Sequence, residues 1–330
     1  MLPASFDRFE ESSLERCVSP FSSANEFTQP ARAEPNMSNN RPAASFSSLT
    51  GHSPKQKVVE AGAYQTGDPV YTPLLCDAQS ELIGFEPHPE AFAALRNSSS
   101  SRRTFFPHAV GDGRRRTLRI CASKDMTSLF EPNLDVLNLF HGFPAWSRVV
   151  ATESVQTVRL DDVAETAGMT FLQMDVQGAE LLALQHAQVR LREALVLHLE
   201  VLFLPLYVDQ PLFSDVEQFL RHRGYVFHCF FAPTNRIIQP MTIDGNIMSG
   251  LNQLVWADAV FVRDFSRLEH LDDRELLTMA AIMHDCYHSW DLTLRLLIEL
   301  DRRTDGTLAP GYLAALRDGP GRVSELASVA

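Results

Sequence analysis

The sequence predicts an α/β protein with a mostly parallel, doubly wound sheet, helices on both faces and a helical segment appended at the C-terminus. Short apolar strands alternate with amphipathic helices along most of the chain, which is typical of such a sheet. The strands are continuous apolar runs, as expected where helices cover both faces. From about residue 265 only helical spacing remains.

Three parts are predicted along the 330 residues. Residues 1–54 are rich in Ser, Asn, Pro and Ala without sustained periodicity, so we expect a disordered or loosely held extension. Residues 55–264 carry the strand–helix alternation and form the main domain. Residues 265–330 form a helical appendage, which could bury its leucines against the domain or form a homodimer interface.

Composition excludes several classes of protein. A net charge of −12 argues against nucleic-acid binding, because phosphates repel an acidic surface. None of the five cysteines forms a CxxC motif, so neither a metal site nor a disulfide framework is predicted. The chain shows no secretory signal and no apolar run long enough to span a bilayer. We therefore expect a cytoplasmic protein.

The first half of the main domain contains three predicted strands. KVVEAGAY begins with a short buried strand that ends in a turn, and ELIGFEPHPEAFAAL gives a second strand followed by a helix from Glu90. RRTFFPHAV gives a third strand. The GDG turn that follows predicts that RRRTLRICAS is its hairpin partner.

The second half continues the alternation. In MTFLQMDVQGAELLALQHA a strand ends at Asp175, a turn follows at Gly178, and helical spacing begins at Ala179. ALVLHLEVLF is a continuous apolar strand, DVEQFLRHRGY is a helix, and YVFHCFF and WADAVFVR are the last strands. Two C-terminal segments, ELLTMAAIMHDCYHSWDLTLRLLIELDRR and GYLAALRD, have helical spacing.

Acidic residues follow three of these strands, namely Glu60, Glu86 and Asp175. Ligands of open α/β sheets bind at the carboxyl ends of strands, and an acidic residue after the second strand can accept hydrogen bonds from ribose hydroxyls. Glu60 could hold the first loop or contact the amino-acid end of a nucleoside cofactor. Gly62 would let the backbone turn tightly and approach a ligand.

The first loop argues for a cofactor without phosphate. It reads EAGAYQTGDP and lacks the spaced glycines of G-x-G-x-x-G, which let a pyrophosphate rest on a helix N-terminus. S-adenosylmethionine needs no such cradle, whereas NAD does. An NAD-type oxidoreductase is therefore the alternative, and a catalytically silent binding module is a second one.

Four segments together resemble the FkbM-type methyltransferase family. They are FLQMDVQGAELLALQHA, IGFEPHPEAF, HAVGD with TSLFEP, and HLEVLFLPLYVDQPLF, and they occur in the family's order between residues 57 and 263. The resemblance implies a Rossmann-like class I methyltransferase sheet, S-adenosylmethionine as the methyl donor, and O-methylation of a small-molecule or glycan acceptor such as a sugar or polyketide hydroxyl.

The resemblance also assigns cofactor-binding residues by position. The first cofactor loop would contain Glu60, Gly62 and Ala63, and the ribose would be bound by Glu86 and Pro87. The adenine would lie near Ala109, Val110 and Asp112, and Asp175 would lie at the reaction centre. This chain departs from many members in having a longer first loop that is poorer in glycine.

A hydroxyl acceptor is a poor nucleophile, so a general base is expected. Asp175 is the first candidate, Glu180 in the first turn of the next helix is the second, and Glu200 on the next strand is the third. His198 shares a strand face with Glu200 and is either a further base or a core histidine. The i, i+4 pair His284 and His288 has no third ligand, so a partly exposed helix face is expected for it.

Overall fold

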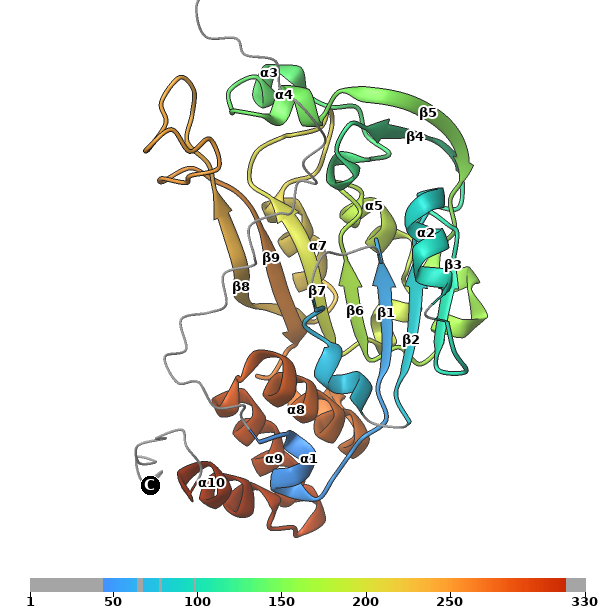
Figure 1. Ribbon diagram of the computed structural model, residues 1–330. Helices are drawn as coiled ribbons and strands as arrows, with labels where there is room; N and C mark the ends of the chain where they lie inside the picture. The colour runs from blue at the N-terminus through green and yellow to red at the C-terminus, as the bar shows by residue number, and fades with distance from the viewer. Residues whose placement is uncertain (1–43, 64–67, 77–78, 98, 319–330) are drawn as a thin grey trace, which may run out of the picture. The chain divides into compact units, whose positions relative to one another are not determined.

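The computed structural model describes residues 44–63, 68–76, 79–97 and 99–318. Within them, seven strands form one sheet in the order β3-β2-β1-β6-β7-β9-β8 (Figure 1). Their bounds are β1 (Lys57–Ala61), β2 (Glu81–Phe85), β3 (Arg103–Phe106), β6 (Phe171–Met174), β7 (Val196–Leu202), β8 (Tyr225–Asn235) and β9 (Leu254–Arg263). All neighbouring pairs are parallel except those made by β9, which confirms the mostly parallel sheet.

The chain reverses its direction of travel across the sheet at β1. From β1 it moves outward to β2 and β3, and it returns on the other side at β6. The carboxyl ends of β1 and β6 therefore flank the topological switch point, where open α/β sheets bind ligands.

One face of the sheet is covered by α5 (Glu180–Gln185), α6 (Arg190–Glu193) and α7 (Phe213–Arg221). A row of aligned, buried apolar side chains crosses five strands on this face and packs against leucines of the three helices. The row consists of Ile83, Val59, Leu172, Leu197 and Phe261.

At the amino ends of the strands, the opposite face packs against the C-terminal helices α8 (Asp273–Tyr287) and α9 (Trp290–Thr304), with α10 (Leu308–Asp318) against α9 (Figure 1). Here the row Leu82, Val58, Phe171, Val196 and Val262 packs in one cluster with apolar side chains of α8. The appendage is helical as predicted. Leu276, Met279, Leu296 and Leu297 of these helices are buried within the chain, whereas Ile298 of α9 is exposed.

The N-terminal extension differs from the expectation where it is described. Residues 1–43 lie outside the described residues, but Phe46–Thr50 form the helix α1. Phe46 is 1% exposed, and its amide donates to Asp285 Oδ1 of α8 at 2.7 Å. The part from residue 44 is thus packed on the C-terminal helices. Phe46 is one of the scattered phenylalanines that left room for docking, but its partner residues lie more than 200 positions away and are not indicated by any local pattern.

The expectation of a partly exposed pair at His284 and His288 is wrong for His284. His284 is 1% exposed, with Nδ1 at 2.8 Å from Tyr312 Oη and Nε2 at 2.8 Å from the carbonyl oxygen of Ala44. His288 is exposed and ends α8 in the left-handed conformation. The burial of His284 is caused by α1 and α10, which cover a helix face that α8 alone would leave open.

The predicted hairpin around the GDG turn is also wrong. β3 pairs with β2, and β4 (Arg115–Cys121) pairs with β5 (Val149–Gln156) in a separate antiparallel sheet. Between these two strands lie α3 (Leu134–Leu137) and α4 (Phe143–Trp146), above the carboxyl ends of the central strands (Figure 1). The GDG turn is a local signal for a hairpin with the preceding strand. The partner that β4 has in the structure, β5, follows later in the chain, after α3 and α4.

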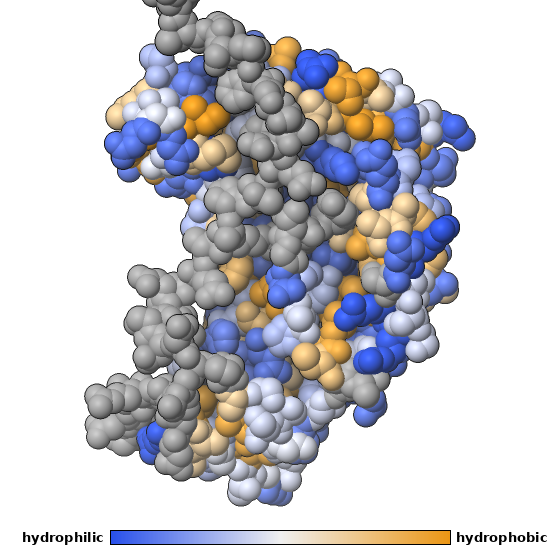
Figure 2. All heavy atoms as spheres, in the orientation of Figure 1, coloured by the Kyte–Doolittle hydropathy of each residue, from blue (hydrophilic) through white to orange (hydrophobic). Residues whose placement is uncertain are grey.

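Apolar side chains remain at the surface of this β4–β5 region (Figure 2), including Leu134 at 55% and Val150 at 52% exposure. No helix in the described ranges is both long and apolar enough to cross a membrane. The remaining elements are short: α2 (Pro89–Arg96) and the 3-10 turns η1 (Thr72–Cys76), η2 (Lys124–Met126), η3 (Leu160–Asp162), η4 (Ala164–Thr166) and η5 (Leu268–His270).

Candidate active site

The loops after β1 and β6 touch at the switch point. Gly62 has φ +82°, and a Cβ atom at this position would overlap the carbonyl oxygen of Asp175. The amide of Asp175 in turn donates to the carbonyl oxygen of Ala61 at 2.9 Å. Glycine was expected here for a close approach to a ligand. The structure gives a different reason, because it is the backbone of the β6 loop that comes close.

The first loop is held by the residues that the sequence singled out. Glu60 is 2% exposed, and its Oε2 accepts a hydrogen bond from the Tyr71 hydroxyl at 2.5 Å. Burial and the neighbouring Glu60 carboxylate both raise the pKa of Tyr71, so this hydroxyl stays a donor. The amides of Gly62 and Ala63 both donate to the carbonyl oxygen of Phe85, which ties the loop to the end of β2.

Glu86 lies at the carboxyl end of β2 and is 7% exposed. Its Oε1 accepts a hydrogen bond from the amide of His88 at 2.8 Å, across Pro87 and just before α2. The carboxyl group is therefore fixed at this strand end by the start of the helix. This position suits the predicted ribose contact of Glu86 and Pro87.

The predicted adenine residues lie at the base of the β4–β5 sheet. Ala109 and Val110 are buried, and Val110 packs in the core. The Asp112 carboxylate accepts hydrogen bonds from Arg116 Nη2 at 2.6 Å and from Thr157 Oγ1 at 3.2 Å. The bond from Arg116 is the main reason that the pKa of Asp112 falls to about 2. This carboxylate joins β4 to the chain after β5, and adenine contact stays a prediction.

Three carboxylates converge at the carboxyl ends of β6 and β7. Asp175, Glu180 and Glu200 each have an oxygen within 4.8 Å of the other two, and Glu180 and Glu200 are buried. All three were predicted as candidate bases from separate positions along the chain, and the parallel pairing of β6 with β7 brings them together.

Gln177 organises this cluster, and sequence reasoning did not single it out. Its Nε2 donates to Asp175 Oδ1 at 2.7 Å and to Glu200 Oε2 at 2.8 Å, while its Oε1 accepts from the Tyr207 hydroxyl at 2.8 Å. Its backbone has φ +52°, unusual for a residue other than glycine, and its carbonyl accepts from Ser128 Oγ at 2.6 Å. The only signal was its place inside the D-V-Q-G-A-E motif.

Glu180 turns back onto the loop that precedes it. Its Oε1 accepts hydrogen bonds from the amides of Val176 at 2.9 Å and Gly178 at 3.3 Å. Burial, and then the charge of Asp175, raise the pKa of Glu180 to about 8. At neutral pH this side chain is largely protonated, so it stabilises the turn more than it supplies a charge.

Glu200 is 9% exposed. Burial raises its pKa well above the ordinary value, and the charges of Asp175, Glu180 and Asp258 raise it further. Like charges at this separation cannot all ionise without cost. The cluster therefore retains protons at neutral pH, which is the property expected of a group that exchanges a proton in a reaction.

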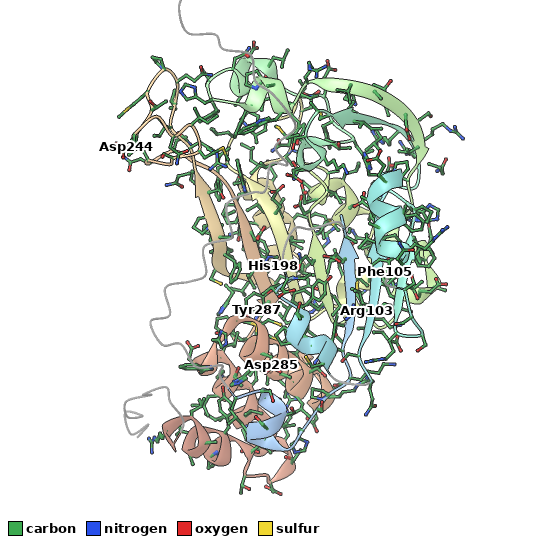
Figure 3. All side chains as sticks on the ribbon, in the orientation of Figure 1. Arg103, Phe105, His198, Asp244, Asp285 and Tyr287 are labelled. Carbon is green, nitrogen blue, oxygen red and sulfur yellow. The ribbon has the colours of Figure 1, made fainter. Side chains whose placement is uncertain are left out.

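His198 shares the strand with Glu200 but has other partners. Its Nε2 lies 3.2 Å from Asp258 Oδ2, and its Nδ1 lies 3.0 Å from the Tyr287 hydroxyl. Figure 3 shows His198 beside Tyr287, where the sheet meets α8. The side chain is 1% exposed, so it is a core histidine linking the sheet to the C-terminal helices.

The three carboxylates could also coordinate a cation, since hard divalent cations prefer oxygen ligands. The amide nitrogen of Gln177 already donates to two of them, Asp175 and Glu200. The raised pKa values of Glu180 and Glu200 further weaken the set as metal ligands.

A search of family models matches residues 60–227 to the methyltransferase FkbM domain. The chain belongs to this family. The matched region begins at Glu60 and contains the clustered carboxylates Asp175, Glu180 and Glu200. The protein is therefore a methyltransferase with a Rossmann-like class I sheet, which confirms the prediction from the sequence resemblance.

A search of solved structures found the human methyltransferase 10 domain containing protein. It is 11% identical in sequence, and the match covers 66% of this chain and 78% of that one with a TM-score of 0.26. A search of curated protein sequences found no match.

Proposed function

We propose that this methyltransferase uses S-adenosylmethionine to methylate a hydroxyl group of a sugar, glycan or natural-product-like acceptor. The observation that carries the proposal is the pair of carboxylates Asp175 and Glu200, bridged by Gln177 at the switch point of the sheet. A hydroxyl must lose its proton when it is methylated. Burial and the charge of Asp175 keep Glu200 protonated, so the Asp175 carboxylate is the member of the pair that can accept the proton.

The residues around the switch point suit S-adenosylmethionine chemically. Glu86 and Glu60 are acceptors at the ends of adjacent strands, fitting the hydroxyl and ammonium groups of a nucleoside amino acid. The first loop offers no glycine-rich phosphate cradle, which disfavours a dinucleotide. When bound, S-adenosylmethionine supplies an electrophilic methyl group.

The chain's own groups then have separate tasks. Asp175 orients the acceptor hydroxyl and takes up its proton, while Glu200, whose raised pKa keeps it protonated, holds the Asp175 side chain in place together with Gln177. Gln177 is a positioning residue that fixes both carboxylates, and Tyr207 fixes Gln177. Glu180 maintains the β6–α5 turn through its two amide contacts. Much of the acceleration would come from holding donor and acceptor in line.

Calorimetric titration with S-adenosylhomocysteine tests the cofactor assignment. We expect stoichiometric binding, no response to NAD, and affinity weaker by about tenfold or more in Glu86→Ala, since a hydrogen bond to a charged group is lost. Glu90→Ala is the matched control, because Glu90 lies four residues on and its side chain is 79% exposed. A folded protein that binds NAD but no S-adenosylhomocysteine would overturn the proposal in favour of an oxidoreductase. Binding of neither would leave a silent module.

Transfer of a radiolabelled methyl group to a panel of sugars and amines tests the acceptor class. We expect label in hydroxyl-bearing acceptors, and at least about a hundredfold less in Asp175→Asn with S-adenosylhomocysteine binding retained. Label confined to amines would refute O-methylation while leaving the cofactor assignment intact.

A further inference from the structure

Two arginines stack on aromatic rings at opposite ends of the β8–β9 pair. The guanidinium of Arg263 lies 4.5 Å from the centroid of the Tyr225 ring, and that of Arg236 lies 4.8 Å from the Trp256 ring. Both rings belong to the paired strands, and both stacks hold the plane of a guanidinium fixed. The two arginines differ in what their nitrogen atoms bind.

Arg263 is satisfied by the protein itself. Its Nε donates to the carbonyl of Ala194 at 2.9 Å, its Nη1 to that of Arg223 at 3.3 Å, and its Nη2 to that of Leu191 at 2.7 Å. Every nitrogen of this guanidinium has a backbone acceptor. Arg263 therefore has a structural role at the amino-terminal end of the sheet.

Arg236 is satisfied on one side only. Its Nη1 donates to the carbonyls of Asn235 at 3.1 Å and Met248 at 3.4 Å. Its Nε is buried without a hydrogen-bond partner, and within the described part of the chain Nη2 has no acceptor and no carboxylate forms an ion pair with the group. The residue is 7% exposed, and burial lowers its pKa from the ordinary value, although a guanidinium stays charged.

The unsatisfied edge has a defined chemistry. Nε and Nη2 of arginine point in parallel and form the fork that binds two oxygens of a carboxylate or phosphate. A buried charge with unmade hydrogen bonds destabilises a protein unless a partner completes it. In Arg236 the carbonyls of the β8–β9 loop and the Trp256 ring hold the group so that this fork is the edge left over.

Arg236 lies at the reaction edge of the sheet. In the antiparallel β7–β9 pair, Glu200 is opposite Asp258, and Leu202 is opposite Trp256. Trp256 is therefore two residues beyond Asp258 on the same face, a step of about 7 Å. It lies toward the carboxyl end of β7, so a molecule reaching from Glu200 to the Arg236 fork passes along one sheet face.

We propose that Arg236 binds an anionic group of the methyl acceptor, a carboxylate or a phosphate. The identity of this anion as the acceptor rests on the proposed function, whereas anion binding by Arg236 does not. The charges of Asp175 and Asp258 repel an anion, and Arg236 attracts it. This polarity would orient the acceptor with its charged group at the Nε and Nη2 edge of Arg236 and a hydroxyl toward Asp175.

Nitrogen-15 NMR of arginine Nε–H groups tests the proposal on the full chain. The Arg236 signal is assigned by its loss in Arg236→Lys, and the probes are glucuronate, glucose 6-phosphate and neutral glucose. We expect a saturable shift of the Arg236 signal with at least one anionic probe and none with glucose. A response to glucuronate indicates a carboxylate, and one to glucose 6-phosphate a phosphate. The Arg263 signal is the internal reference and should not move.

Arg236→Gln should weaken binding of the active anion by about tenfold or more, measured by competition or calorimetry. Its binding of S-adenosylhomocysteine should equal that of the wild type, so failure of the cofactor assignment is recognised separately. If Arg236→Gln does not fold, the wild-type signal still decides. Absence of any saturable shift with both anions, or an equal shift of the Arg263 signal, would overturn the proposal.

Discussion

The central strands bury apolar side chains at their amino ends and carboxylates at their carboxyl ends. At the amino end, Val58, Phe171 and Val196 pack with Leu276 and Met279 of α8 in a cluster of apolar side chains. At the carboxyl end, the same strands lead into buried or half-buried carboxylates, where burial and the charge of Asp175 raise the pKa values of Glu180 and Glu200. Apolar burial stabilises the fold, whereas desolvated acids destabilise it. Apolar packing at the amino end therefore offsets the cost of the desolvated carboxylates at the carboxyl end.

The largest expected effect lies at the amino end. Leu276→Ala removes a fully buried side chain and should lower the free energy of unfolding by about 2–5 kcal/mol, measured by urea denaturation. Ile298→Ala in α9 is the control, since this side chain is 48% exposed and should cost less than about 0.5 kcal/mol. S-adenosylhomocysteine affinity of the folded variant should not change. Equal costs at both sites would contradict the comparison.

Gly62→Ala breaks the contact between the β1 and β6 loops. We expect a loss of about 2–4 kcal/mol in stability and weaker S-adenosylhomocysteine binding, because the new Cβ overlaps the Asp175 carbonyl. Gly168→Ala is matched to it, with φ +76° and no atom near the added Cβ, so it should show only the backbone strain of about 1–2 kcal/mol. If both variants lose the same amount, the loop contact does not matter.

Glu180→Gln should change how stability depends on pH. Between the ordinary pKa of 4.5 and about 8, folded Glu180 holds a proton that the unfolded chain has released. Stability from this group therefore falls as pH rises through that window. Glutamine keeps the acceptor for Val176 and Gly178 without titrating, so the variant should lose about 3 kcal/mol less than wild type between pH 5 and 8. Parallel curves in thermal unfolding would argue against a buried, protonated Glu180.

The smallest expected effect on stability is at the ion pair between the Asp112 carboxylate and Arg116. Arg116→Ala should cost less than about 1 kcal/mol, because the arginine side chain is 41% exposed and solvent screens the pair. The pKa of Asp112, now about 2, should rise in the variant when followed by NMR. The pKa of Asp112 is lower in the folded protein than its ordinary value of 3.8. The pair therefore stabilises the fold fully at pH values above 3.8, and this stabilisation is lost as the pH falls toward 2. An unchanged pKa would show that Thr157 and backbone amides suffice.

The strands and the acids at their ends were predictable from the sequence. Continuous apolar runs followed by Glu60, Glu86 and Asp175 identified the sheet and its mostly parallel order, and they predicted the edge at which the acidic residues lie. These signals are local, because strand length, burial and turn residues are properties of short segments. The motif around Asp175 likewise identified the family before any contact was known.

Contacts between distant segments were decided only by the tertiary structure. Tyr207 and Glu200 set the direction of the Gln177 side chain, β5 replaced the expected hairpin partner of β4, and α1 buried His284. Nothing in the sequence distinguishes Arg236 from the other arginines. Only the structure shows that its guanidinium lies over Trp256, donates to the Met248 carbonyl and has a buried Nε without a hydrogen-bond partner. A sequence determines which segments form strands and helices through short-range periodicity. Hydrogen-bond partners and desolvation depend on residues far apart in the chain, so only the fold determines which polar groups are paired.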